Sequence, residues 1–326
     1  MWVLIPGATI QTPSRLGAWL FPLYSQICAN LASSGKVVLA LEHRDGTSPV
    51  CRIGSSDGKA RAKFYINPEH VIWDDKDVPI ARLALREEQL DFRQRELCHA
   101  YTAFRKLTCN GERGALQTMD GVLIDWSAWM PSDTEQWVRC ESSVALAGHS
   151  FGGATVFSVL SNPPLESEPI IQIPVSHAIA LDPWLEPLAY PGPAPISADD
   201  TPASHTKLLV INAEGFTLWK DHYARLLEVV PAWRGSYVLT MIGAKHVSFS
   251  DFPVMLPRLI RDPAAHRIIG IINKLVLAFV DDRLKEALDA PSMPTRKMEI
   301  QVDEPSWWSK KGNRRLVGQP GDVIVH

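Results

Sequence analysis

The segment SSVALAGHSFGGA (142–154) places one serine between glycines, directly after a short apolar run. Gly148-x-Ser150-x-Gly152 has the spacing of a nucleophile elbow, in which a sharp turn between a strand and a helix holds the serine in a strained backbone conformation. The glycines leave room for that turn, and the start of the following helix favours developing negative charge. We therefore interpret Ser150 as a nucleophile. His149, inside the motif, is expected to be structural and to point away from the serine.

A serine hydroxyl is a poor nucleophile unless a neighbouring base takes its proton. In sheets that carry this elbow, the acid and then the histidine follow the serine along the chain. Of the ten histidines, His246 lies just past the apolar run SYVLTMIG (236–243), in a loop at the carboxyl edge of the last predicted strand. Other histidines precede the serine, lie before a strand or fall in helical patterns: His43, His99, His205, His222 and His266. His246 is therefore the predicted base.

Two residues are candidates for the acid of a serine, histidine and acid triad. Asp182 ends the apolar run in HAIALDPW, and Glu214 ends the run in LLVINAEGF. Both would lie at the carboxyl edge of a parallel sheet, within reach of a histidine there. Counting strands after the serine mildly favours Glu214, because many sheets of this kind carry their acid on that strand. The residues alone leave the choice open.

Short apolar runs rich in β-branched residues are typical of buried parallel strands. They occur at 2–5, 36–42, 143–149, 177–182, 207–214 and 236–243. Helical patterns follow them, and the longest cover 81–107 and 263–288. Strands that alternate with helices predict the α/β class, with a mostly parallel, doubly wound sheet flanked by helices. We expect a single domain over 1–290 and an irregular C-terminal tail over 291–326.

Composition narrows the function classes. The net charge is −3 and 46% of residues are hydrophobic, which argues against a nucleic-acid partner and against a disordered chain. No metal-binding spacing and no dinucleotide-binding glycine motif occurs, so we expect no metal and no cofactor. The cysteines are widely spaced, and we expect free thiols and a cytoplasmic location. They are Cys28, Cys51, Cys98, Cys109 and Cys140.

Several segments, in order, resemble the platelet-activating-factor acetylhydrolase family of the plasma and intracellular type II kind. They include LYSQICANLASSGKVVLALEHRDGTSP, LREEQLDFRQREL, LAGHSFGGAT, AIALDPW, LLVINAEGFTLW and KHVSFSDFP, across about residues 16–290. EHRDG and GHSFGGAT carry the most specificity, and EHRD is interpreted as a structural charge network. The resemblance implies the α/β-hydrolase fold. It also implies that Ser150 is the nucleophile, His246 the base and Asp182, from the LDPW segment, the acid.

The resemblance further implies a reaction and a partner. The expected reaction is calcium-independent hydrolysis of a short sn-2 acyl ester, such as acetyl, in platelet-activating-factor-like or oxidised phospholipids. A phospholipid substrate implies transient contact with a membrane surface, for which the amphipathic 81–107 segment is a candidate. Phe216 and Trp219 are candidates for lining the lipid pocket. The alternative is a general carboxylesterase that acts on small soluble esters.

The oxyanion hole of such an enzyme needs two backbone N–H donors. Phe151, after the serine, is expected to supply one and Leu16 the other. Around Leu16 the chain reads SRLGA, so Ser14 and Arg15 replace the His-Gly of the family pattern. We therefore expect an altered N-terminus with incomplete early strands. Loss of one donor costs about 10²–10³ in rate, so a catalytically impaired lipid-binding homologue is a further alternative.

Overall fold

The structure is a computed structural model that describes residues 2–5, 23–54, 60–73, 83–112, 125–131, 138–162, 171–190, 192–196, 206–233, 235–302 and 314–326. Its strands are β1 (Trp2–Ile5), β2 (Val38–Ala40), β3 (Val50–Gly54), β4 (Ala60–Phe64), β5 (Val144–His149), β6 (Val175–Leu181), β7 (Lys207–Ala213), β8 (Tyr237–Met241), β9 (Thr295–Arg296), β10 (Ile300–Val302), β11 (Arg314–Leu316) and β12 (Val323–Val325). Its helices are α1 (Ser25–Ser33), α2 (Ala84–Asn110), α3 (Phe151–Ser161), α4 (Glu214–Leu218), α5 (Lys220–Val229), α6 (Phe252–Met255), α7 (Ala265–Val280) and α8 (Leu284–Asp289).

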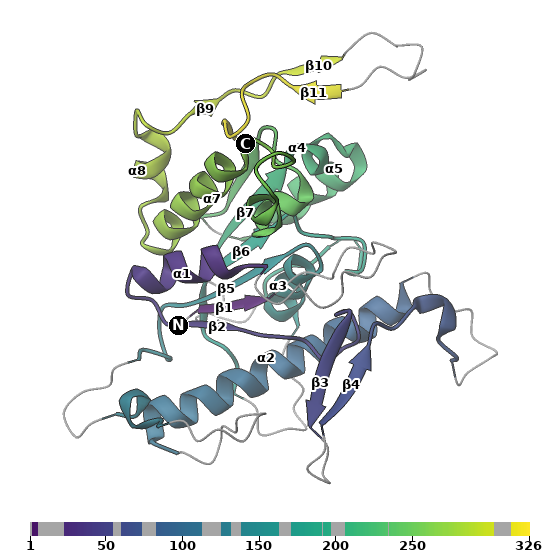
Figure 1. Ribbon diagram of the computed structural model, residues 1–326, viewed down its shortest axis with the longest axis vertical. Coiled ribbons are helices and arrows are strands. Elements are labelled where there is room, and N and C mark those ends of the chain that lie inside the picture. Colours follow the sequence, from purple (N-terminus) through teal and green to yellow (C-terminus); the bar gives the residue numbers. More distant parts are fainter. Residues whose placement is uncertain are drawn as a thin grey trace.

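Eight of the described strands form one central sheet in the order β2-β1-β5-β6-β7-β8-β12-β9 (Figure 1). Every neighbouring pair from β2 to β8 runs parallel. β12 pairs antiparallel with β8, and β9 runs parallel to β12. The prediction of a mostly parallel sheet flanked by helices is confirmed, and each of the six predicted strands is present.

Alternate residues of the central strands enter two separate cores, one on each face of the sheet. On β5, Val144 and Leu146 pack with α2, α3 and α5, whereas Ala145 and Ala147 pack with α1, α7 and α8. Both faces of these strands are therefore buried. This explains why the strand sequences are continuous apolar runs rather than alternating ones.

The same sheet edge receives the loops that follow β5, β6 and β8. Ser150 comes directly after β5, Asp182 directly after β6, and His246 a few residues after β8. Because these strands are parallel neighbours of one sheet, their carboxyl ends meet at one edge. The fold thus brings together three residues that lie far apart in the sequence.

The expectation of an irregular tail over 291–326 is wrong for the described part of that segment. β9 and β12 extend the central sheet, and β10 and β11 form an antiparallel pair that projects from the body (Figure 1). These strands are two or three residues long, too short to produce a periodic signal in the sequence. β12 forms because the free edge of β8 supplies its hydrogen-bond partners, so tertiary pairing decides its structure.

Two further findings concern membrane-spanning helices and the cysteines. None of the described helices is long and apolar enough to cross a membrane. The five cysteines all lie within the described ranges, and none of them forms a disulfide. This agrees with the expectation of thiols rather than disulfides.

Candidate active site

Ser150 occupies a strained turn between β5 and α3. Its backbone has φ 57° and ψ −117°, a region that side-chain-bearing residues rarely adopt. The turn is possible because Gly148 approaches the backbone of Gly152 so closely that a Cβ at 148 would lie 2.1 Å from the Gly152 carbonyl oxygen. A Cβ at Gly153 would lie 2.8 Å from Pro183. The elbow therefore depends on glycine at these positions.

A chain of hydrogen bonds runs from the serine to a buried carboxylate. The Ser150 hydroxyl donates to Nε2 of His246 over 2.9 Å, and Nδ1–H of His246 donates to Asp182 Oδ2 over 2.9 Å. The other oxygen of Asp182 accepts the Ala213 N–H over 2.6 Å. Complete burial raises the pKa of the Asp182 carboxyl, and the bonds from His246 and Ala213 oppose this by favouring the carboxylate. This geometry is suited to nucleophilic acyl transfer.

Local backbone geometry decides which candidate acid reaches the histidine. Asp182 has φ 45°, and its N–H donates to the Ile211 carbonyl over 2.9 Å. The carboxylate of Glu214 instead accepts the N–H groups of Leu316 over 2.7 Å and Gly243 over 2.8 Å. The structure therefore places Asp182, and not Glu214, against His246.

Two rings flank the imidazole of His246. The Phe216 ring is stacked on it, with centroids 4.9 Å apart and planes 4° from parallel. The His149 ring lies 4.5 Å away at 42°, and its Nδ1 is hydrogen-bonded to the Tyr24 hydroxyl over 2.7 Å. Burial first, and then repulsion from His246, lower the pKa of His149 far below its usual value, so His149 stays neutral. His149 therefore adds no positive charge next to the base.

The contact between His149 and His246 was not found from the sequence. His149 was interpreted there only as a structural residue within the elbow. Its position directly before Ser150 is the one signal that could have suggested it, because residues beside a nucleophile lie near the base. The partner Tyr24 directly precedes α1, in a segment that no sequence pattern connects with His149. Only the folded arrangement brings the two together.

Phe151 is the first residue of α3, so its backbone N–H is among those with no acceptor inside the helix. Its ring is buried between the guanidinium of Arg93, 4.5 Å from the ring centre, and the ring of Trp184, 5.9 Å away. This arrangement suits an N–H held in place to stabilise an oxyanion. Leu16, the other predicted donor, lies outside the described residues.

The EHRD segment supplies the partner of that arginine. Asp45 and Arg93 form a buried ion pair with Oδ2 to Nε at 2.6 Å, and Thr47 is hydrogen-bonded to both. Burial alone would raise the pKa of Asp45, but Arg93 and Thr47 hold it below the usual value. Asp45 thus belongs to a buried charge network behind the elbow, whereas Glu42 and Arg44 of the same segment are exposed.

The two residues predicted to contact lipid lie at different positions relative to the base. Phe216 faces the base, whereas Trp219 is 41% exposed and is stacked on His222, with centroids 4.9 Å apart. His222 in turn is hydrogen-bonded to the Pro183 carbonyl over 2.8 Å, one residue after Asp182. Phe216 is therefore next to the reacting groups, and Trp219 lies one ring layer further out.

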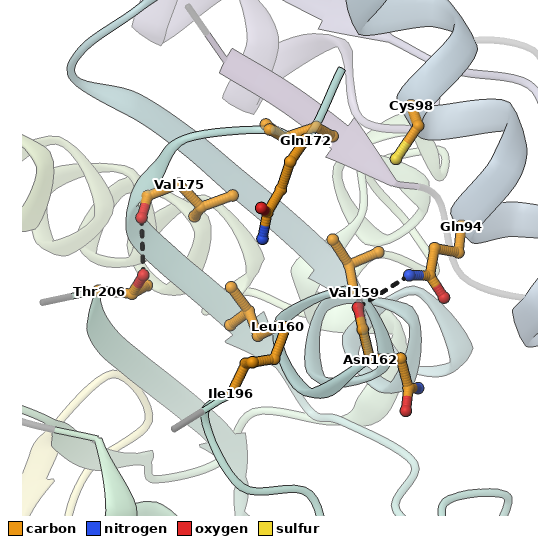
Figure 2. A pocket seen from close by; sticks show the side chains of 10 residues that line it. Gln94, Cys98, Val159, Leu160, Asn162, Gln172, Val175, Ile196 and Thr206 are labelled. Atoms are coloured by element: carbon orange, nitrogen blue, oxygen red, sulfur yellow. Dashed lines mark hydrogen bonds between the residues drawn. The ribbon is translucent and has the colours of Figure 1, made fainter. Parts of the chain in front are cut away.

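A pocket between α2 and α3 lies elsewhere (Figure 2). Its walls include Gln94, which donates to the Asn162 carbonyl over 3.0 Å, and Thr206, which donates to the Val175 carbonyl over 2.6 Å. Val175 and Thr206 lie at the amino ends of β6 and β7, the edge opposite Ser150. A substrate bound to the serine would therefore not occupy this pocket.

Among the described residues, His149, Asp182 and His246 offer metal-ligating atoms within 4.8 Å of one another. Two of the three are already hydrogen-bonded to each other. The ring of the third is packed against the imidazole. These three residues therefore lie close together because two of them form the hydrogen-bond chain from Ser150 and the third packs against it.

The chain is similar in sequence to known proteins. The family model described as platelet-activating factor acetylhydrolase, isoform II, matches residues 16–290. A platelet-activating factor acetylhydrolase from Gallus gallus is 28% identical over 278 residues, which cover 80% of this chain and 58% of the relative. A putative phospholipase A2 from Schizosaccharomyces pombe is 25% identical over 278 residues, covering 73% of this chain and 58% of the relative. The chain thus spans a little over half the length of these relatives.

Among solved structures, a ferulic acid esterase from Streptomyces cinnamoneus aligns with a TM-score of 0.48 and 19% identity, over 89% of this chain and 70% of that chain. The family match covers most of the chain and includes the elbow, Asp182 and His246. The protein therefore belongs to the platelet-activating factor acetylhydrolase, isoform II, family and has the α/β-hydrolase fold.

Proposed function

We propose that this protein is a serine esterase that hydrolyses the short sn-2 acyl ester, acetyl above all, of platelet-activating-factor-like or oxidised phospholipids. The hydrogen-bond chain from Ser150 through His246 to Asp182, on a strained elbow, is the observation that carries the proposal. The Gallus gallus relative is a platelet-activating factor acetylhydrolase and the Schizosaccharomyces pombe relative is a putative phospholipase A2, which supports a lipid substrate.

The proposed reaction has two steps. Oγ of Ser150 attacks the ester carbonyl while Nε2 of His246 takes the hydroxyl proton, and the Phe151 N–H stabilises the oxyanion. The tetrahedral adduct collapses, the lyso-lipid alcohol leaves with that proton, and acetyl-Ser150 remains. Water activated by His246 then releases acetate. Asp182 holds the tautomer and stabilises the imidazolium. No step uses calcium, so a calcium chelator should leave the rate unchanged.

A fluorophosphonate probe tests the proposal because it reacts with activated serines and needs little substrate recognition. The intact protein should gain the mass of one adduct, and Ser150→Ala should gain none. Ser33→Ala, at an exposed serine of α1, serves as the matched control and should be labelled like the parent protein. A folded protein that takes up no probe would contradict the esterase proposal and favour the impaired lipid-binding homologue.

Substrate class is tested by comparing kcat/KM for an acetylated ether phospholipid and for a small aryl acetate. A higher value for the phospholipid supports the proposal. A strong preference for the aryl ester would favour the general carboxylesterase. We further propose a cytoplasmic location, which the lack of disulfides among the five cysteines supports and which fractionation of cells would test.

The membrane contact that a lipid substrate requires has a candidate surface beside the site. α6 and the turn after it expose Phe252, Met255, Leu259 and Ile260, and Leu259 is 99% exposed. α6 packs against the 3₁₀ turn that begins at His246. Exposed apolar side chains in one continuous segment are typical of a surface that meets another apolar phase. We place the membrane contact here rather than on α2, whose apolar side chains are largely buried.

The double variant Leu259→Ser, Ile260→Ser tests this surface. It should bind phosphatidylcholine vesicles at least several-fold more weakly while its rate on a soluble aryl ester is unchanged. Ile72→Ser is the matched control, because Ile72 is 87% exposed and lies in a different part of the chain. Equal vesicle binding by the parent protein and the double variant would place the contact elsewhere.

A further inference from the structure

We propose that residues 314–326, here called the C-terminal segment, form a working part of the active site by fixing the position of His246 through Glu214 and α4. The inference rests on the proposed function, because it concerns the same base. It assigns a role to Glu214, which follows a strand at the acid position of many related sheets and yet does not contact the imidazole. The family match ends at residue 290, so the C-terminal segment lies beyond it.

The first link is the carboxylate of Glu214 itself. Its Oε1 accepts the N–H of Leu316, in the C-terminal segment, over 2.7 Å. Its Oε2 accepts the N–H of Gly243, three residues before His246, over 2.8 Å. One side chain thus joins the C-terminal segment to the loop that carries the base. Hydrogen bonds to a carboxylate are among the stronger ones in proteins.

The second link clamps the turn that leads to His246. The Ile242 N–H donates to the Asp322 carbonyl over 2.9 Å, and the Gly321 N–H donates to the Ile242 carbonyl over 2.8 Å. Gly243 has φ 70°, and a Cβ there would lie 2.9 Å from Pro320. The turn is therefore held by backbone bonds on one side and by close packing on the other.

The third link reaches α4 from the last residue. Nε2 of His326 is hydrogen-bonded to the Thr240 hydroxyl over 2.7 Å, and that hydroxyl is 2.6 Å from the Thr217 hydroxyl on α4. Leu218, also on α4, packs against an apolar cluster that includes Leu316. α4 is thus connected to the C-terminal segment through Glu214 and Leu218 directly and through Thr217 by way of Thr240.

These attachments matter because α4 carries Phe216, whose ring is stacked on His246 at 4.9 Å. A five-residue helix has no stability of its own, so tertiary contacts set its position. A shift of α4 or of the Gly243 turn would move the imidazole relative to Ser150. Glu214 is therefore a positioning residue, and it acts on the reaction only through His246.

The principal test is Glu214→Gln, which keeps the shape of the side chain but turns an amide NH₂ toward one of the two N–H donors. The matched control is Glu228→Gln, at an exposed glutamate of α5. The rate constant for fluorophosphonate labelling of Ser150 should fall about tenfold to a hundredfold in Glu214→Gln, since misplacement of about 1 Å can cost about 10²-fold. The control should match the parent protein.

A second variant distinguishes misplacement of the base from misfolding of the Glu214→Gln protein. Thr217→Val breaks the independent link to Thr240 and His326 at nearly constant volume, and it should lower the labelling rate in the same direction. Thermal melts identify any variant that is unfolded at the assay temperature. A loss of labelling in folded variants, with KM for an aryl ester little changed, is the expected pattern of a misplaced base.

A spectroscopic readout separates this inference from the proposed function. The proton NMR spectrum should contain a low-field signal from the His246 Nδ1–H bonded to Asp182, absent in Asp182→Asn. If the parent protein takes up no probe, the esterase proposal fails, and a shifted or broadened signal in Glu214→Gln would still support positioning. The inference is overturned if Glu214→Gln and Thr217→Val are folded and keep the low-field His246 signal of the parent protein. If the parent protein is labelled, both variants must also keep its labelling rate for this conclusion.

Discussion

The guanidinium carbon of Arg93 lies 4.5 Å from the centre of the Phe151 ring, and both side chains are fully buried. Phe151 follows the proposed nucleophile, and its N–H is the proposed oxyanion donor. The arginine is held in turn by Asp45. A buried ion pair thus stands directly behind the residue whose backbone must stay in place during the reaction.

Arg93→Met should lower the free energy of unfolding by about 3–5 kcal/mol, because it leaves the buried Asp45 carboxylate without its cationic partner. Urea denaturation measures the change. Lys285→Met, at an exposed ion pair with Asp289, should leave the midpoint of urea denaturation unchanged. A loss below about 1 kcal/mol for Arg93→Met would show that water or another group compensates Asp45.

Asp182→Asn should reduce both labelling and ester hydrolysis by about 10⁴-fold, because an amide favours the wrong tautomer of the base. The protein should remain folded, since the two side chains have the same shape. Burst and steady-state kinetics measure the loss. Asp221→Asn, at an exposed position of α5, controls for the substitution itself. A loss of less than tenfold would mean that Asp182 does not serve as the acid.

Two glycine-to-alanine substitutions should have opposite effects. Gly148→Ala places a methyl group 2.1 Å from a carbonyl oxygen, so we expect loss of labelling together with a fall in melting temperature. Gly270→Ala, in the exposed part of α7, meets open space and should stabilise the protein by about 0.4–1 kcal/mol. Calorimetry measures the stability of both variants, and probe labelling measures the reactivity of Ser150 in each. A Gly148→Ala protein that labels normally would contradict the elbow.

The stability of the protein should fall as the pH drops below about 6.5, the ordinary histidine value. Burial lowers the pKa of His149 and of His222 in the native state, so the unfolded chain takes up protons there that the native state does not. The stabilisation is complete above the unfolded pKa and is lost toward acid pH, at up to about 1.4 kcal/mol per pH unit for each such histidine.

Melting temperatures between pH 5 and about pH 8 measure this slope, at constant ionic strength. His149→Gln should make the slope shallower, whereas His266→Gln, at an exposed position of α7, should not. An unchanged slope in His149→Gln would mean that His149 takes up protons equally in the native and unfolded states.

The sequence was sufficient for the sheet and for the grouping of Ser150 and His246. Short apolar runs rich in β-branched residues, followed by helical patterns, are typical of buried parallel strands, and parallel strands bring their carboxyl ends to one edge. The choice between Asp182 and Glu214 was not decidable from spacing, because both follow strands and face the same edge. Backbone geometry at Asp182, with φ 45°, turns its carboxylate toward the base. The roles of these residues stay predictions.

Two parts of the molecule were beyond sequence reasoning for different reasons. β12 has three residues and no periodicity, and it exists because β8 offers an edge. The stacking of Phe216 on His246 depends on where α4 lies, which no local pattern encodes. Phe216 was expected to contact lipid, and its position beside the base keeps that expectation open.

The place of β12 has a consequence for synthesis of the protein. During translation, Ser150, Asp182 and His246 all leave the ribosome well before residues 323–325, so the nascent chain carries every proposed reacting group while one side of β8 is still unpaired. An unpaired strand edge is a template for association with other chains. We therefore expect association with other chains to be favoured in the interval before β12 pairs, and mutations that weaken β12 should lower the yield of soluble protein before they affect the chemistry.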